Sequence, residues 1–279
     1  MRNLIHANMK RIWKTRAFRV AAVFVAALAL FQVLVLYLDY VMNQGSPYFD
    51  NNFFSIAAMG IFPLAAFVPL YIGTEFSDGT IRNKLVVGQR RWAIYSANLV
   101  TAVIAGWLLT AIWSVVYLIP GVILLKSANP FILYVLVYGG MLCEMAVFSA
   151  LFTLISMLSG NRAGSAVACI LLTLVLFLSG IVISSTLEEG EFYSPEYQVS
   201  ESGEIEYIVE LEPNPNYLPE GSRKRAVYEF LLDFTAGGQA LQFAGMQAGH
   251  IGRMVLYDLG WFVVMSGTGI LLFRRKGLK

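Results

Sequence analysis

Six long apolar segments, separated by polar stretches, dominate the hydrophobic pattern of this chain. A helix needs about 20 apolar residues to cross the hydrocarbon core of a bilayer, which is about 30 Å thick. Each segment reaches that length, so the pattern predicts an all-α membrane protein with six transmembrane helices. The segments cover residues 18–38, 53–72, 93–125, 131–158, 164–184 and 254–273.

Two of these segments are longer than one upright span. The third contains Pro120 followed by Gly121, where we expect the helix to kink or break. The fourth is expected to tilt in the bilayer. The first segment is too long for the apolar region of a signal peptide and is expected to remain as a span.

Composition supports the membrane assignment. The chain has 279 residues, of which 57% are hydrophobic and 14% are charged, whereas soluble domains carry about 25% charged residues. The mean hydropathy is +0.64. Both cysteines, Cys143 and Cys169, fall within predicted spans, so no disulfide framework is expected.

The distribution of basic residues predicts the orientation. With six spans, 15 of the 20 Lys and Arg residues fall on one side, in the N-terminal segment, the 74–91 loop, the Arg162 turn and the C-terminal tail. Basic residues accumulate on the cytoplasmic side of membrane proteins. The pattern therefore predicts that both termini are cytoplasmic, with a basic tail that follows the last span in residues 254–279.

The N-terminal segment, residues 1–17, is predicted to be a cytoplasmic amphipathic helix. Ile5, Met9, Ile12 and Trp13 recur at helical spacing, and the other face is basic. Two interpretations remain open: a basic anchor for the first span, or a helix that lies in the membrane interface and contacts neighbouring elements.

The region 185–253, between the fifth and sixth spans, is too long for an ordinary connection. We expect a small α+β external domain here, with a hairpin over about 193–211 and a helix over 223–234 that Ser222 caps and Gly237-Gly238 ends. Residues 239–249 are expected to rest on the outer membrane face. Its first half is acidic, which either solvates the surface or attracts cationic ligands: Glu188, Glu189, Glu191, Glu196, Glu201, Glu204, Glu206, Glu210 and Glu212.

The most informative polar stretch is the 74–91 loop, which joins the second and third of the spans in residues 18–184. Gly79-Thr80 is expected to end one element and begin the next. Ile81 and Leu85 lie one helical turn apart and are expected to be buried. Glu75, at the inner end of its span, must be paired or hydrated to be tolerated there.

This loop resembles that of the permease subunits of ABC-2 type transporters, which have six spans and cytoplasmic termini. The resemblance rests on an acidic residue followed by Gly-Thr and a basic residue, and the basic C-terminus and N-terminal helix agree with it. It implies a coupling helix that docks on a cytoplasmic ATPase and comprises Glu75, Phe76, Asp78, Gly79, Thr80, Ile81, Arg82 and Lys84.

The resemblance further implies an exporter in the cell (plasma) membrane of a bacterium. Two permease copies, or this chain and a homologous permease, would form the pathway, and peptides are one candidate substrate class. No Gly-Lys dipeptide occurs in the chain, so there is no P-loop. ATP and Mg²⁺ are therefore expected on the separate ATPase dimer, and neither a bound cofactor nor a nucleic-acid partner is expected.

Glu144, near the middle of the fourth span, is the second candidate site. A carboxyl group at that depth either takes part in function or forms a structural hydrogen bond. Asp39 and Asp258 are assigned to external ends of spans. Two other functions stay open: a sensor or scaffold that binds a ligand through region 185–253, and an intramembrane enzyme, for which Glu144 lacks an evident catalytic partner in the spans.

Overall fold

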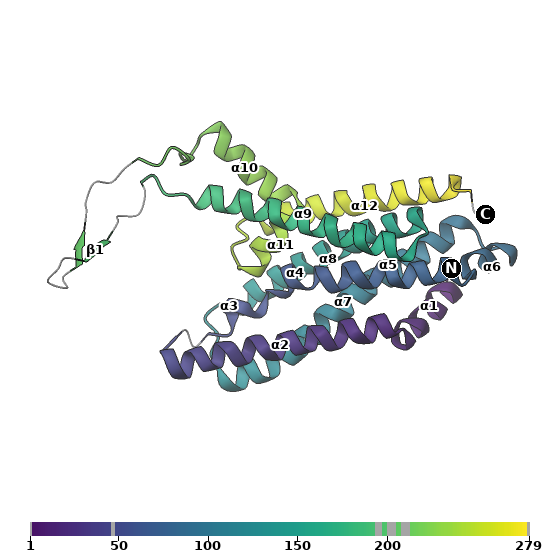
Figure 1. Ribbon diagram of the computed structural model, residues 1–279, viewed down its shortest axis with the longest axis horizontal. Helices are drawn as coiled ribbons and strands as arrows, with labels where there is room; N and C mark the ends of the chain where they lie inside the picture. The colour runs from purple at the N-terminus through teal and green to yellow at the C-terminus, as the bar shows by residue number, and fades with distance from the viewer. Residues whose placement is uncertain (1, 46–47, 193–196, 200–204, 208–212, 278–279) are drawn as a thin grey trace.

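The computed structural model of the chain describes residues 2–45, 48–192, 197–199, 205–207 and 213–277. Its long helices lie lengthwise beside one another as an elongated bundle (Figure 1). They are α2 (Arg16–Asn43), α5 (Ile61–Ser77), α7 (Arg91–Leu124), α8 (Phe131–Ser159), α9 (Arg162–Glu188) and α12 (Ile251–Arg275). Together with the short helix that precedes α5, they give six candidate spans by length and composition, as predicted.

The two ends of the bundle differ. The N-terminal helix α1 (Arg2–Lys14), the short helix α6 (Thr80–Val86) and the C-terminus lie at one end (Figure 1). The short helix α3 (Asp50–Phe53) lies toward the opposite end, and the strands β1 (Tyr197–Val199) and β2 (Ile205–Tyr207) lie beyond it. The bundle therefore gathers both termini and the 74–91 loop at one place.

Helix α8 lies at the centre of the packing. It packs most extensively on α12, and it also contacts α5, α7 and α9. Large side chains on α8 are buried at helical spacing, which explains why this sequence forms a core helix; they are Met141, Met145, Phe148 and Phe152. By contrast, α2, α9 and α12 expose much of their apolar surface, as expected for helices that face hydrocarbon.

The second apolar segment is not one continuous helix. It starts with two single turns, α3 and α4 (Ile56–Met59), before α5 begins at Ile61. Between the two turns, the Ser55 hydroxyl donates to the Asn52 carbonyl (2.7 Å) and to the Gln32 side chain on α2 (2.8 Å). A hydroxyl that bonds back to the preceding turn competes with the helix ladder, which accounts for the interruption.

Helix α7 does not break at Pro120, contrary to one of the expected outcomes. It continues to Leu124, and the following Leu125 nitrogen still donates to Gly121 (2.9 Å). Proline removes one backbone donor, and packed neighbours in a membrane bundle allow a helix to tolerate that loss. Here α7 packs against α2, α8 and α12, so tertiary contacts override the local signal.

The N-terminal helix forms as predicted, but its buried face is shifted. Ile12 is buried and Ile5 and Met9 are partly buried, whereas Trp13 is exposed. Asn8 is buried instead. The helix packs on α7 and meets a polar partner there, so the buried face is selected by a hydrogen bond that hydrophobic spacing alone does not reveal.

The region that follows α9 contains two described helices. Helix α10 (Arg223–Phe234) matches the expected bounds, and the Ser222 side chain accepts from the Arg225 nitrogen (3.2 Å). The strands β1 and β2 pair antiparallel with Val199 opposite Ile205. The rest of the expected hairpin, with Glu196, Glu201, Glu204, Glu210 and Glu212, lies outside the described residues.

Two expectations about the segment after α10 were wrong. Gly237-Gly238 does not end a helix but lies in the first turn of α11 (Ala236–Ala244). Residues 239–244 do not rest on an outer face, because α11 packs against α4, α8 and α9 and buries Ala240 and Phe243. A Cβ on Gly180 of α9 would lie 2.8 Å from the Gly237 carbonyl oxygen. The small size of these glycines thus allows the two backbones to approach closely. In the sequence alone, the same pair of glycines is typical of a helix end.

Candidate functional site

The junction between α5 and α6 begins the candidate site. Helix α5 ends at Ser77, Gly79 adopts a left-handed conformation (φ 65°), and α6 starts at Thr80. The Gly79 nitrogen donates to the Phe76 carbonyl (3.2 Å), and the Asn83 nitrogen donates to the Gly79 carbonyl (2.9 Å). Glycine takes this backbone conformation at little cost. The prediction that Gly79-Thr80 separates two elements is therefore confirmed.

Glu75 is fully buried just before this junction. Its Oε1 accepts from Arg11 of α1 (2.7 Å) and from the Lys84 ammonium of α6, and its Oε2 accepts from the Asn98 amide of α7 (2.8 Å). A buried carboxylate is tolerated when cations and hydrogen-bond donors replace its hydration. The expectation that Glu75 must be paired is confirmed.

A second layer of contacts holds the partners of Glu75. The Asn8 amide donates to the Asn98 side chain (2.9 Å), and the Tyr71 hydroxyl donates to the Asn8 carbonyl (3.1 Å). The Arg11 guanidinium lies 3.9 Å from the centre of the Tyr71 ring, in the geometry of a cation–π contact. We call Asn8, Arg11, Tyr71, Glu75, Lys84 and Asn98 the Glu75 cluster; it joins α1, α5, α6 and α7.

Helix α6 has two different faces. Ile81 is buried and Leu85 is half-buried, as expected, so this face attaches α6 to the bundle. Arg82 and Asn83 are exposed, and the apolar side chains of Val86 and Val87 are 81% and 78% exposed. The outward face therefore combines a cation with exposed apolar surface at the end of the bundle.

The remaining residues of the predicted coupling loop do not join the cluster. Asp78 is exposed, Thr80 is half-buried at the start of α6, and the half-buried ring of Phe76 lies 4.5 Å from the Lys276 ammonium. The structure thus divides the predicted set: Glu75, Ile81 and Lys84 anchor α6, whereas Asp78 and Arg82 face outward.

The C-terminal tail is attached to the same end of the bundle. The Lys276 ammonium donates to the Met157 carbonyl at the end of α8 (3.0 Å), and burial lowers the pKa of Lys276. Arg91, at the start of α7, donates to the carbonyls of Phe273 (3.4 Å) and Lys276. These contacts link α12 to α7 and α8 beside the 74–91 loop.

Glu144 lies in the interior of the bundle, as predicted for a carboxyl group that avoids lipid. It is fully buried on α8. Asp258, which was assigned to the external end of the sixth span, is also buried, on the neighbouring helix α12, and interacts electrostatically with Glu144. Among the described residues, Glu144 has no hydrogen-bond partner, whereas the side chain of Gln239 on α11 interacts with Asp258. Asp39, on α2, is half-buried and accepts from Asn43 (3.1 Å).

Sequence reasoning missed Asn8, Arg11 and Asn98 as members of the Glu75 cluster. Asn98 carries a usable signal, since an amide inside a transmembrane segment commonly bonds to a neighbouring helix. Arg11 is indistinguishable in sequence from the other basic residues of the N-terminal segment. Within the described part of the chain, no group of three or more His, Cys, Asp or Glu side chains is arranged to hold a metal ion, and both cysteines are free thiols.

Comparison with known proteins adds no relative to this picture. Neither the protein-family models nor the curated proteins contain a match to this chain.

Proposed function

We propose that the chain is the permease subunit of an ABC-2 type exporter, driven by a separate cytoplasmic ATPase. The observation that carries this proposal is the construction of α6, which has an outward face with exposed Arg82, Val86 and Val87 and an inward face anchored through Lys84 to Glu75. An element built in this way is suited to receive a force on one face and pass it to the bundle through the other.

The Glu75 cluster supplies the route for that force. Through Lys84, Glu75 and Asn98, a displacement of α6 acts on α5 and α7, and through Arg11 it acts on α1. The contacts are charged or buried hydrogen bonds, which hold their geometry more strictly than apolar contacts do. Movement of α6 is therefore expected to move these helices as a unit.

In this proposal the end that carries α6 and both termini faces the cytoplasm. The basic residues at that end support this orientation. ATP and Mg²⁺ act on the ATPase dimer, and two permease copies, or this chain and a homologous permease, enclose the pathway. The acidic residues between α9 and α10 support cationic peptides as substrates.

Binding to the ATPase tests the proposal most directly. The double variant Arg82→Glu/Val86→Asp changes only exposed side chains of α6, so the permease is expected to fold while co-purification with the ATPase falls by at least about tenfold, the equivalent of about 1.4 kcal/mol. Arg223→Glu, an exposed charge reversal on α10, is the control and is expected to leave the complex intact. Equal recovery of the ATPase with both variants would exclude α6 as its docking element.

A second measurement separates docking from transmission. Glu75→Gln leaves the outward face of α6 unchanged but weakens its anchor. We expect the variant to bind the ATPase while transport-stimulated ATP hydrolysis falls. A variant that binds and retains wild-type stimulation would show that the Glu75 cluster does not transmit the movement.

A further inference from the structure

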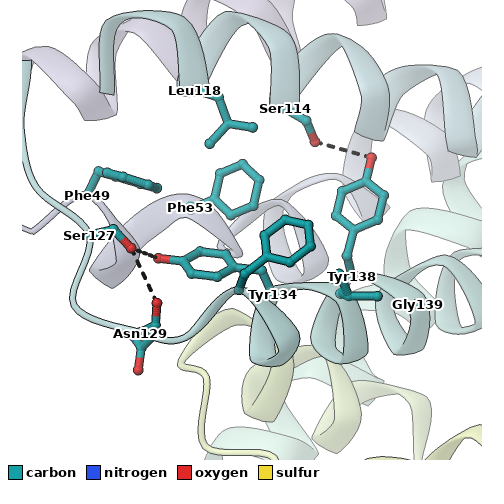
Figure 2. A pocket seen from close by; sticks show the side chains of 11 residues that line it. Phe49, Phe53, Ser114, Leu118, Ser127, Asn129, Tyr134, Tyr138 and Gly139 are labelled. Atoms are coloured by element: carbon teal, nitrogen blue, oxygen red, sulfur yellow. Dashed lines mark hydrogen bonds between the residues drawn. The ribbon is translucent and has the colours of Figure 1, made fainter. Parts of the chain in front are cut away.

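A pocket of about 610 Å³ opens between α3, α7 and α8, toward the end of the bundle away from the termini. Figure 2 shows its aromatic and aliphatic lining, in which Phe53, Leu118 and Tyr134 surround a shared space. Its volume lies within the range of small-molecule sites, about 300 to 1,000 Å³. None of the residues assigned to the coupling loop lines it.

The hydrogen-bonding groups of the pocket are already paired with protein atoms. The Ser114 hydroxyl donates to the Tyr138 hydroxyl (3.3 Å), and the hydroxyls of Ser127 and Tyr134 lie 2.9 Å apart (Figure 2). The Tyr134 hydroxyl also donates to the buried carboxylate of Asp50. An occupant therefore finds apolar surface and paired hydroxyls, which favours an apolar chain over a polar ligand.

The pocket opens on the surface of a helix that is apolar enough to span a membrane. Phe131 is 82% exposed at the start of α8, and Val135 is exposed one turn later. In a bilayer the medium next to these side chains is hydrocarbon. An empty space would lose dispersion contacts on all its walls, so a lipid tail is the available occupant.

An exposed cation directly precedes one of the polar residues that line the pocket. Lys126 is exposed, directly precedes the lining residue Ser127, and forms no ion pair with the described residues. The nearby carboxylate of Asp50 is buried and accepts from the backbone nitrogens of Ala128 (2.6 Å) and Asn129 (3.0 Å). Lys126 is therefore exposed beside the lining residue Ser127, whereas the nearby carboxyl group of Asp50 is enclosed.

We propose that this pocket binds one acyl chain of an anionic phospholipid, with the lipid phosphate beside Lys126. The tail enters between Phe131 and Val135 and occupies the space bounded by Phe53 and Leu118. Since lipid tails are as apolar as the pocket, shape and headgroup charge supply the selectivity. This inference depends on the protein spanning a membrane, and it does not depend on coupling to an ATPase.

Gly139 provides a variant that fills the pocket. It lines the pocket, and a Cβ there meets no atom within 4 Å. The matched control is Gly267 on α12, where a Cβ also meets open space and which does not line the pocket. We expect Gly139→Phe to occupy the tail site without strain, and Gly267→Phe to leave it accessible.

The test uses native mass spectrometry of the full chain released from vesicles that contain equal amounts of phosphatidylglycerol and phosphatidylcholine. The wild-type protein and Gly267→Phe are expected to retain one phosphatidylglycerol molecule, and Gly139→Phe to lose it. Lys126→Gln is expected to reduce the preference for phosphatidylglycerol by about fivefold, because one basic residue near anionic lipid contributes about 1 kcal/mol. Thermal unfolding of each variant in detergent checks that it is folded.

Retention of the same lipid by Gly139→Phe would overturn the proposal, as would an unchanged lipid preference in Lys126→Gln. A change from dimer to monomer in Gly139→Phe, without loss of lipid, would also overturn it and would assign the pocket to a protein interface. If Gly139→Phe does not fold, a photoreactive residue at Val135 replaces it. Cross-links from that position to phosphatidylglycerol tails support the proposal, and cross-links only to protein contradict it.

Discussion

Two glutamates of this bundle are fully buried, and their surroundings are opposite. Glu75, near one end of the bundle, is contacted by two cations and an amide. Glu144, in the interior, interacts electrostatically with Asp258 of α12 and has no hydrogen-bond partner among the described residues. A buried carboxyl group that accepts from two cationic side chains holds them in place through charged hydrogen bonds. Two buried carboxyl groups that interact without a cation among the described residues repel each other and do not fix their helices in the same way.

This contrast assigns different roles to the same residue type. The Glu75 cluster holds four helices by charge, so it can transmit movement from α6. No cation of the described residues pairs with Glu144 or Asp258, so this pair contributes little to holding α8 and α12 together.

Loss of the Glu75 charge is expected to have the largest effect. Glu75→Gln leaves Arg11 and Lys84 beside a neutral amide, and uncompensated charge at a buried pair costs about 3 kcal/mol of unfolding free energy. Glu144→Gln is the matched control, since it makes the same chemical change at an equally buried site that lacks a cation. Unfolding of both variants in detergent measures the difference. Similar losses in the two variants would contradict the contrast.

The contact between α8 and α11 near Glu144 is expected to depend on side-chain packing and not on charge. Gly140 lies one turn before Glu144 on α8, and a Cβ there would lie 2.6 Å from the Phe243 ring of α11. Gly140→Ala is therefore expected to cost about 2 kcal/mol through overpacking. Its neighbour Gly139 faces open space, so Gly139→Ala is expected to be neutral or slightly stabilising.

Equal losses in the two glycine variants, measured by thermal unfolding in detergent, would contradict a cost that comes from the contact with α11, because alanine favours a helix more than glycine does. A loss confined to Gly140→Ala would show that the region beside Glu144 is closely packed, in contrast to the charged contacts around Glu75.

The two cations of the Glu75 cluster are expected to contribute unequally. The Lys84 side chain is 15% exposed and the Arg11 side chain 31% exposed, so water screens Arg11 more. Double-mutant cycles that pair Glu75→Gln with Lys84→Met or Arg11→Met are expected to give coupling energies of about 2 and about 1 kcal/mol. The reverse order, measured by unfolding, would mean that α1 and not α6 is the main partner of Glu75.

The sequence predicted the positions of the helices better than the contacts between them. Periodicity and length located all six apolar helices, and Gly79-Thr80 marked the start of α6, because these features are local. The partners of Glu75 on α1 and α7 depend on which helices are neighbours, which a single sequence does not reveal. The burial of Asp258 was not predicted for the same reason, because it depends on how α12 packs on α8.

Region 185–253 shows the limit of local signals more plainly. Ser222 and the spacing after it predicted α10 because capping is decided within a few residues. Gly237 and Gly238 were interpreted as a helix end, whereas a Cβ on Gly237 would meet the Leu176 backbone of α9 and a Cβ on Gly238 the Leu232 backbone of α10, so both positions require a small residue. A glycine in a sequence does not by itself show whether it ends a helix or permits a close approach between two helices.

The smallest change in unfolding free energy is expected for substitutions of Glu144 and Asp258. Glu144→Gln and Asp258→Asn each remove one of two facing carboxyl groups, so each is expected to leave stability unchanged or raise it by about 1 kcal/mol. The double variant is expected to gain less than the sum, because the first substitution already removes the repulsion. Unfolding of the four proteins completes the cycle, and Glu144→Leu with full transport would exclude a substrate role. A loss of several kcal/mol in both single variants would instead show that a cation occupies this site in the membrane and that the pair, like Glu75, is held by charge.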